Sequence, residues 1–210
     1  MRKIGAAKVT AVVLAAGRSS RMGQAKQLIE VDGLPMVVRA TTTALQCDAA
    51  EVAVITGAYA TEVAERLTSL RREYANQLSI FHNADWSTGQ ASSVRVAVAA
   101  LQERSIAILF LPVDQPFVPV MLLNQLIAAW QAGALLAAPA IAGKIRGAPA
   151  IFDGSLFPEL LALEGDTGAR PLLQRHRVDL VTIPAEAAWL RDIDTLDDLA
   201  AVVGSGKRSS

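Results

Sequence analysis

Short apolar runs recur along the first half of this chain, and they constrain its fold more than any other feature. They cover residues 10–14, 51–56, 79–81 and 107–111, and each has the length and apolar content of a buried strand. Longer segments with helix-start signals separate them. This alternation predicts right-handed βαβ units and a mostly parallel sheet, so the expected fold is a single doubly wound α/β domain.

The helices expected between these strands begin at residues that favour a helix start. Their expected extents are 35–45 from Pro35, 62–71 behind Thr61, a run to Leu101 from Ser92 or Ser93, and a run to Trp130 from Pro119. Candidate strands at 135–139, 148–152, 179–183 and 189–192 are expected to extend the sheet, and one of them can run antiparallel. Thr195-Leu-Asp-Asp has the spacing of a capping box and predicts a final helix.

Length, charge and cysteine content limit the classes of function. With 210 residues, 52% of them hydrophobic, we expect one domain over residues 1–203 and a disordered polar tail over 204–210. A formal net charge of zero gives no general attraction for nucleic acid or an anionic membrane. The single cysteine, Cys47, excludes an internal disulfide, and a cytoplasmic location is expected. The apolar stretch 9–16 is too short to span a membrane.

Polar loops follow several of the predicted strands. Ligands bind beyond the carboxyl ends of the strands in an open parallel sheet. We therefore expect the loops after Leu14, Phe81 and Leu111 and the segment 192–194 to meet at one edge of the sheet.

The first of these loops, residues 14–26, combines glycines with cations. Gly17 and Gly23 allow a close backbone approach to phosphate, and the loop also supplies the cations Arg18, Arg21 and Lys26. Its spacing matches neither the Walker nor the Rossmann motif. Two interpretations follow, a triphosphate cradle or a basic surface loop whose glycines only form turns.

Two groups of aspartates are candidates for binding a metal ion. Asp114 follows the run 107–111, and the pair Asp192 and Asp194 lies at another expected strand end. A hard cation on a triphosphate needs one or two carboxylates. Side chains alternate along extended backbone, so only one of the late pair is expected to face the site. The alternative for Asp114 is a turn-forming or capping aspartate.

The first loop carries the resemblance to a known family. Leu14-Ala-Ala-Gly17, followed by Ser19, Arg21-Met-Gly23 and Lys26, resembles the signature of the molybdenum cofactor cytidylyltransferases and guanylyltransferases. The similarity continues through Asp114, Gly147-Ala-Pro149, Gly165–Arg170 and Asp192–Thr195. The Ala-Ala-Gly form of the loop is similar to the cytidine-using members, whereas Ala148 departs from their frequent Gly-His-Pro. The resemblance implies a Rossmann-like nucleotidyltransferase fold.

The resemblance also implies the roles of individual residues. Catalytic roles are implied for Arg18, Lys26 and Asp114. Nucleotide contacts are implied for Leu14, Ala15, Ala16, Gly17, Arg18, Lys26, Gly57, Asn83, Gly89, Ser92 and Ser93. Acceptor contacts are implied for Gly147, Pro149, Asp166 and Arg170. Metal binding is implied for Asp114 together with one late acid, with Asp194 as first choice and Asp192 as second.

The implied activity is transfer of CMP from CTP to the terminal phosphate of Mo-molybdopterin by a cytoplasmic, monomeric enzyme. Mg²⁺ is the implied cofactor, with Mn²⁺ as its substitute. A molybdenum hydroxylase or its chaperone is the implied recipient of the product. Two alternatives stay open, transfer involving another nucleotide or acceptor, and a noncatalytic chaperone that carries the molybdenum cofactor.

Overall fold

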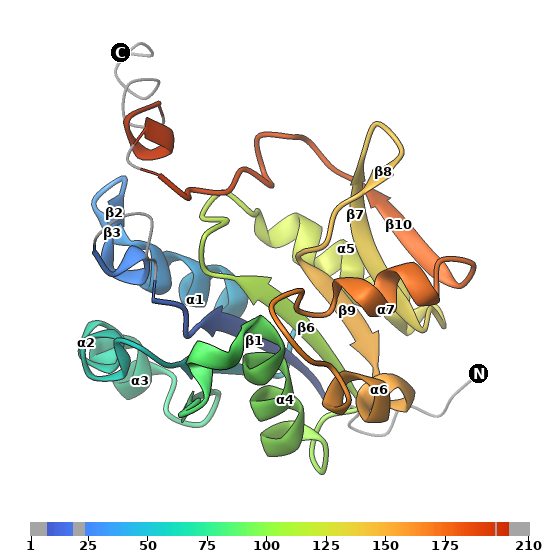
Figure 1. Ribbon diagram of the computed structural model, residues 1–210, viewed down its shortest axis with the longest axis horizontal. Coiled ribbons are helices and arrows are strands. Elements are labelled where there is room, and N and C mark those ends of the chain that lie inside the picture. Colours follow the sequence, from blue (N-terminus) through green and yellow to red (C-terminus); the bar gives the residue numbers. More distant parts are fainter. Residues whose placement is uncertain (1–7, 19–23, 196, 202–210) are drawn as a thin grey trace.

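The computed structural model describes residues 8–18, 24–195 and 197–201, and a sheet of eight strands forms its centre (Figure 1). The strands of this sheet are β1 (Val9–Ala15), β4 (Glu51–Thr56), β5 (Leu78–His82), β6 (Ala107–Pro112), β7 (Leu136–Ile141), β8 (Lys144–Ile145), β9 (Ala150–Asp153) and β10 (Leu180–Pro184). A separate small hairpin consists of β2 (Glu30–Val31) and β3 (Leu34–Pro35).

The helices lie between these strands along the chain. They are α1 (Met36–Gln46), α2 (Ala60–Arg66), α3 (Thr68–Glu73), α4 (Gln90–Leu101), α5 (Val120–Gln131), α6 (Phe157–Leu161) and α7 (Arg170–Arg175). Short 3-10 turns are η1 (Lys26–Leu28), η2 (Trp86–Thr88) and η3 (Gly154–Leu156). No helix within the described part of the chain is long and apolar enough to cross a membrane.

The main sheet is mostly parallel, as predicted, and has the order β10-β7-β9-β6-β1-β4-β5. β1 pairs in parallel with both β4 and β6, β4 with β5, and β10 with β7. β9 runs antiparallel to β6 and β7, and β8 antiparallel to β7. The chain moves outward from β1 through β4 to β5 and then returns to β6 on the other side. The switch point of this doubly wound sheet therefore lies between β1 and β6.

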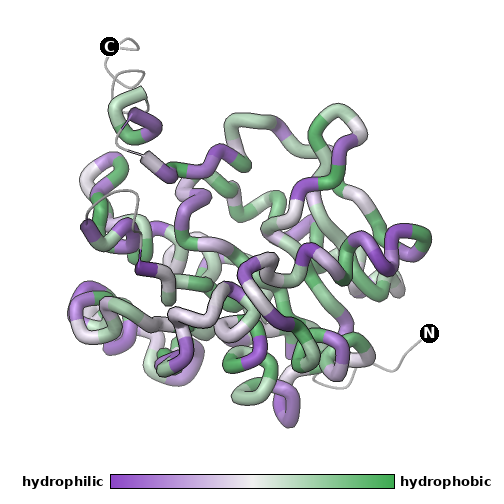
Figure 2. The backbone as a smooth tube through the Cα atoms, viewed as in Figure 1, coloured by the Kyte–Doolittle hydropathy of each residue, from purple (hydrophilic) through white to green (hydrophobic). Residues whose placement is uncertain are grey.

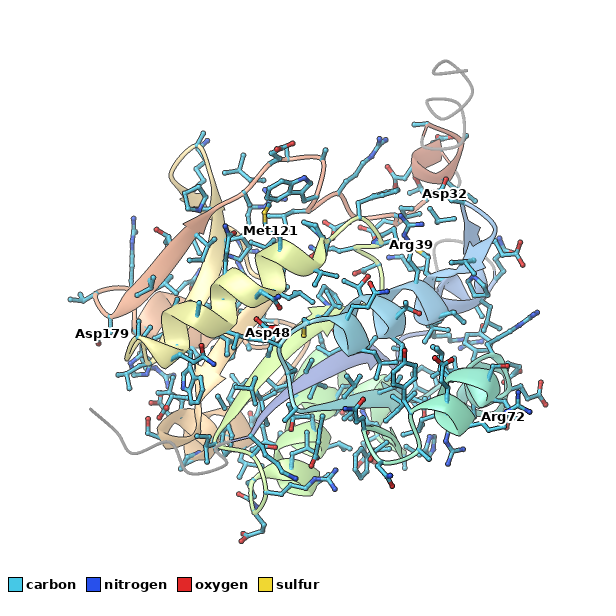
Figure 3. The ribbon with its side chains drawn as sticks, turned by 180° about the vertical axis from the view of Figure 1, so that it is seen from behind. Asp32, Arg39, Asp48, Arg72, Met121 and Asp179 are labelled. Carbon is cyan, nitrogen blue, oxygen red and sulfur yellow. The ribbon has the colours of Figure 1, made fainter. Side chains whose placement is uncertain are left out.

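Helices cover both faces of the sheet, and β1 shows why. Val9, Ala11 and Val13 belong to the core under α1 and α5, whereas Val12 belongs to the core under α4, α6 and α7. Strand side chains alternate between faces, so a strand buried on both faces is apolar throughout. Figure 3 shows α1 and α5 side by side across the first face. In Figure 2 the central strands are largely green and the purple segments lie mainly at the periphery.

Two predicted helix starts are wrong. The helix predicted behind Thr61 begins at Ala60 and is divided at Leu67 into α2 and α3. The helix predicted from Ser92 or Ser93 begins at Gln90, because Gly89 adopts φ +113° between the 3-10 turn η2 and the helix. A glycine at the N-cap can take this conformation without a Cβ penalty.

The strand predicted at 189–192 does not form. The only buried side chains there and just beyond are Leu190 and Ile193, which are three residues apart, whereas a strand buries every second residue. The segment passes in irregular conformation over the carboxyl edge of the sheet, where the Ile193 amide donates to the Asp114 carbonyl oxygen at 2.9 Å. The predicted final helix is present and is described over residues 197–201. The predicted tail lies outside the described residues.

Candidate active site

The loop after β1 leaves the sheet at its switch point. Leu14 lies level with Ile55 of β4 and Pro112 of β6 in the strand register. The buried Gln27 side chain donates from Nε2 to the carbonyl oxygens of Ala15 at 2.9 Å and Gly17 at 2.6 Å, which holds the start of the loop. Gly17 and Arg18 are exposed at this edge. Arg21 and Gly23 lie outside the described residues, and their roles stay predictions.

Lys26 joins the first loop to two acids from distant parts of the chain. It is only 8% exposed, and its Nζ donates to Asp114 Oδ2 at 3.0 Å and to Asp194 Oδ1 at 2.5 Å. Burial by itself lowers the pKa of Lys26, but the attraction of Asp114 and the hydrogen bonds with both carboxylates outweigh it. The pKa is therefore raised above its ordinary value of 10.5, and the ammonium is charged at neutral pH.

The backbone around Asp194 is held by the predicted capping box. The amides of Asp194 and Thr195 donate to Asp198 Oδ2 at 3.1 and 2.8 Å, and the Asp198 amide donates to Thr195 Oγ1 at 3.1 Å. These bonds satisfy donors at the start of the final helix. Asp198 is therefore a positioning group for the Asp194 backbone.

Asp192 and Asp194 both line the same cleft, which corrects the expectation that only one of them faces the site. The alternation rule does not apply because their segment is not a strand. Asp192 Oδ1 accepts from Gln115 Nε2 at 2.9 Å, whereas it is Asp194 that binds Lys26. Burial raises the pKa of Asp192, the Gln115 hydrogen bond opposes this, and the nearby carboxylates of Asp114 and Asp194 add to it.

The donor chemistry of this acid cluster fits a hard divalent cation. Asp114 and Asp194 already direct carboxylate oxygens at one cationic group, the Lys26 ammonium. No set of three or more His, Cys, Asp or Glu side chains within the described residues forms a complete metal cage. Two carboxylates completed by water and phosphate oxygens are the arrangement that Mg²⁺ favours.

Several residues predicted to contact the nucleotide lie near the ends of β4 and β5, where they hold neighbouring loops in place. Asn83 is fully buried, and its Nδ2 donates to the hydroxyls of Ser92 at 2.8 Å and Ser93 at 3.0 Å. Gly57 packs so closely that an added Cβ would lie 2.5 Å from the Ala16 carbonyl oxygen. These contacts fix the loops after β1, β4 and β5 relative to one another, while direct contacts with a nucleotide stay a prediction.

Asp166, predicted to contact the acceptor, holds the start of α4. Its Oδ1 accepts from the Gln90 amide at 3.0 Å, and the Ala91 amide donates to the Gly165 carbonyl oxygen at 3.1 Å. A Cβ on Gly89 would lie 2.4 Å from the same carbonyl oxygen. The predicted acceptor segment and the predicted nucleotide segment are therefore joined directly.

Replacing Asp166 with alanine is expected to lower the free energy of unfolding by about 1 kcal/mol, because an amide at the start of α4 loses its acceptor. Urea denaturation followed by circular dichroism measures this change. Asp85→Ala is the matched control, since the exposed Asp85 side chain accepts no hydrogen bond from a helix amide of the described residues. An equal loss in both variants would contradict the capping role.

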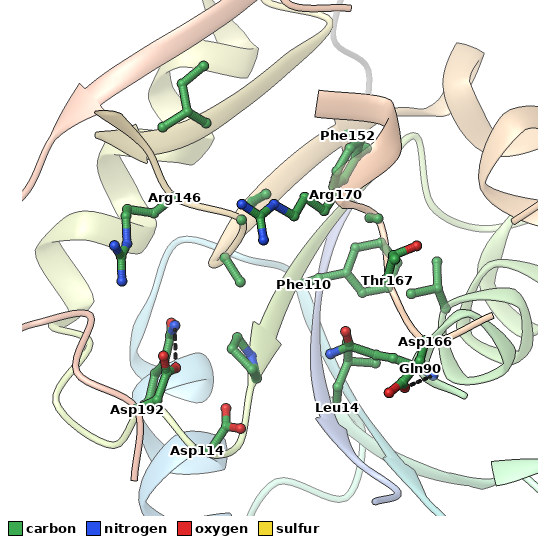
Figure 4. Close-up of a pocket in the computed structure, with 18 of the residues that line it drawn as sticks. Leu14, Gln90, Phe110, Asp114, Arg146, Phe152, Asp166, Thr167, Arg170 and Asp192 are labelled. Atoms are coloured by element: carbon green, nitrogen blue, oxygen red, sulfur yellow. Dashed lines mark hydrogen bonds between the residues drawn. The ribbon is translucent and has the colours of Figure 1, made fainter. Parts of the chain in front are cut away.

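A cleft of about 550 Å³ lies at the carboxyl edge beside β6 (Figure 4). Predicted site residues that line it are Leu14, Asp114, Gly147, Asp166, Arg170, Asp192 and Asp194. Other predicted residues, including Arg18, Lys26, Asn83, Gly89 and Pro149, are not part of this lining within the described chain. The loops that carry these residues border the cleft. The predicted residues therefore lie in one region of the molecule, but only some of them line the cleft itself.

Sequence reasoning missed Arg146, Gln115 and Gln90, which also line the cleft. Arg146 immediately precedes Gly147, and Gln115 immediately follows Asp114. Their position next to a motif residue is the feature of the sequence that could have identified them as site residues. Figure 4 shows Arg146 and Arg170 on the wall across from Asp114 and Asp192. The cleft has an acidic wall and a basic wall.

A charged cleft at the switch point of a doubly wound sheet, bordered by a cationic loop, is the arrangement of a nucleotide-binding α/β protein. Comparison with known protein families identifies the family within this class. Residues 11–180 match the model of the MobA-like NTP transferase domain, and the chain belongs to that family.

Individual relatives agree with this family. The chain is 34% identical over 96 residues to the molybdenum cofactor cytidylyltransferase of Escherichia coli K12, a match that covers 45% of this chain and 46% of that protein. It is 28% identical over 205 residues to a probable molybdenum cofactor guanylyltransferase of Trichormus variabilis, covering 93% and 91%. The crystal structure of Rv0371c from Mycobacterium tuberculosis H37Rv superposes with a TM-score of 0.77 at 27% identity, covering 95% and 99%.

Proposed function

We propose that this protein transfers CMP from CTP to the terminal phosphate of Mo-molybdopterin, giving molybdopterin cytosine dinucleotide and pyrophosphate. The observation that supports this best is the convergence of Asp114 and Asp194 on Lys26 beside the loop after β1. This convergence supports the proposal because a buried cation and two carboxylates lie beside the loop proposed to hold the triphosphate.

In the proposed reaction, an acceptor phosphate oxygen forms a bond to the α-phosphorus of CTP. The bond from that phosphorus to the oxygen that bridges to the β-phosphate breaks, and pyrophosphate leaves. The acceptor is already anionic, so no side chain is needed to remove a proton from it. The protein would contribute alignment and charge neutralisation.

Each residue of the acid and cation cluster has a part in this proposal. Arg18 and Lys26 neutralise charge on the triphosphate, and backbone groups near Gly17 hold its oxygens. Asp114 and Asp194 hold Mg²⁺, for which Mn²⁺ can substitute, and Asp192 supports the cluster through Gln115. When bound, the cation would withdraw charge from the α-phosphate and from the leaving group.

GTP is the main alternative to CTP as the nucleotide substrate. The Trichormus variabilis relative, which matches over 93% of the chain, is named as a probable guanylyltransferase. Ala16, in the Ala-Ala-Gly form of the loop, favours cytidine. The test supplies each of the four common NTPs with Mg²⁺, with and without Mo-molybdopterin, and measures pyrophosphate. We expect release with CTP to exceed release with GTP at least about tenfold and to require the acceptor, since a few contacts to one base give this discrimination.

The outcomes of this panel separate the remaining alternatives. Faster release with GTP would reassign the nucleotide, and release without Mo-molybdopterin would reassign the acceptor. Retention of the cofactor without turnover of any NTP would indicate the noncatalytic chaperone. We also propose that the protein acts as a monomer in the cytoplasm. Its product would be delivered to a molybdenum hydroxylase or to the chaperone of such an enzyme.

A further inference from the structure

Arg146 and Arg170 are two cations on the basic wall of the cleft that have no ion pair with any described residue. Arg146 follows β8 and Arg170 begins α7, and both side chains line the cleft (Figure 4). By contrast, three arginines elsewhere in the chain do pair with acids, Arg39 with Asp32, Arg104 with Glu51 and Arg175 with Glu159. The cleft pair therefore has charge available for a ligand.

The backbone and packing around these arginines bring them together. The Arg146 amide donates to the Pro139 carbonyl oxygen at 2.8 Å, which ties it to the end of β7. Gly147 follows directly, and a Cβ built on it would lie 3.9 Å from Cγ and Cδ of Arg170. The stem of Arg170 thus passes beside the residue next to Arg146, although the two arginines are distant in sequence.

Two guanidinium groups on one wall of a cleft, neither with an ion pair to a described residue, favour a ligand with more than one negative charge. A guanidinium donates in a fork that matches two oxygens of a phosphate, and a phosphomonoester near neutral pH approaches a dianion. The carboxylates of Asp114, Asp192 and Asp194 on the opposite wall repel such a group. A phosphate entering the cleft is therefore held toward the basic wall.

The position of the pair indicates which phosphate it serves. The loop proposed to hold the triphosphate leaves β1, whereas Arg146 and Arg170 lie on the β8 and α7 side of the same cleft. Lys26 joins the loop after β1 to Asp114, and Asp114 lies on the wall across from the arginines (Figure 4). A phosphate bound at the arginines would then lie on the opposite side of the proposed metal site from the triphosphate. The acceptor phosphate that attacks the triphosphate needs this position.

We propose that Arg146 and Arg170 act together as the binding site for the dianionic phosphate of the acceptor. This assignment adds Arg146 to the site and rests on the proposed function, because that function defines which phosphate is the acceptor.

The test measures acceptor binding separately from turnover. Mo-molybdopterin is titrated calorimetrically into the protein without nucleotide, and inorganic pyrophosphate is titrated in a parallel arm. We expect Arg146→Ala and Arg170→Ala each to raise the Kd of Mo-molybdopterin about tenfold or more, because each removes charge-assisted hydrogen bonds. The Kd of pyrophosphate and the KM of CTP are expected to change less than about twofold. Arg146→Lys is expected to recover part of the affinity, because it restores the charge without the fork.

Arg72→Ala is the matched control, since it removes an exposed arginine of α3, away from the cleft. Circular dichroism checks that every variant is folded. Loss of pyrophosphate and CTP affinity without loss of acceptor affinity would overturn the proposal, because the arginines would then bind the triphosphate. Unchanged affinity for Mo-molybdopterin would also overturn it. If the wild type turns over no NTP, the proposed transfer fails, whereas the binding arm still decides the role of the arginines.

Discussion

Replacing Asp114 with asparagine is expected to lower turnover in Mg²⁺ by about a thousandfold, while the protein stays folded. Asparagine has nearly the same shape but no negative charge, so it holds a hard cation weakly and no longer balances Lys26. The measurement is pyrophosphate release at saturating CTP and Mo-molybdopterin, over a titration of Mg²⁺ and then of Mn²⁺. Chelation of the metal from the wild type is expected to reduce turnover at least as far.

Two further substitutions control this result. Asp197→Asn removes an exposed charge from the same segment. It is expected to leave turnover within about twofold, as is usual for surface changes. Asp192→Asn is expected to cost less turnover than Asp194→Asn, because Asp194 shares Lys26 with Asp114 whereas Asp192 binds Gln115. The reverse order would exchange the two late acids as metal ligands. Wild-type turnover in Asp114→Asn would rule out its proposed role.

Replacing Lys26 with methionine is expected to lower kcat about a hundredfold to a thousandfold, with a smaller rise in the KM of CTP. Methionine fills much of the same volume but leaves two carboxylates directed at an uncharged group. Positive charge is then missing where negative charge moves to the leaving pyrophosphate. Steady-state kinetics with CTP and acceptor varied separately give kcat and each KM. The raised pKa of Lys26 means that its own ionisation does not limit activity near neutral pH.

Lys8→Met is the matched control for Lys26→Met. Lys8 also forms a 3.0 Å ion pair, with Glu51, but half of its side chain is exposed and it lies before β1. An exposed pair of this kind contributes little, so stability and turnover are expected to change only slightly. A Lys26 variant that raises the KM of CTP tenfold or more at unchanged kcat would show that Lys26 binds the substrate and transition state equally, contrary to the proposal.

The sequence predicts the sheet well where burial is continuous. β1, β4 and β6 are buried on both faces, so their apolar runs are uninterrupted and their limits lie within one residue or so of the prediction. The helix starts at Gln90 and Ala60 were missed for a different reason. They depend on the φ of Gly89 and on the backbone at Tyr59, and local propensity at nearby serine or threonine does not determine either.

The candidate site divides in the same way. The loop after β1, Asp114 and the capping box at Thr195 were predicted from adjacent residues and strand ends. Arg146 gave no periodic or motif signal of its own, and Asp166 was predicted to contact the acceptor although its carboxylate accepts a bond from the start of α4. Such roles arise from contacts between segments, which local patterns do not report.

By itself, the sequence determined the order of the strands along the chain, the cationic loop and its family, because burial period and motif spacing are local properties. Only the tertiary structure decided that Lys26 binds Asp194, which lies 168 residues away, while Asp192 binds Gln115. The irregular backbone at 191–194 allows both acids to line one cleft, contrary to strand alternation. That geometry depends on how the C-terminal segment crosses the sheet edge, where Ile193 is anchored to the Asp114 backbone.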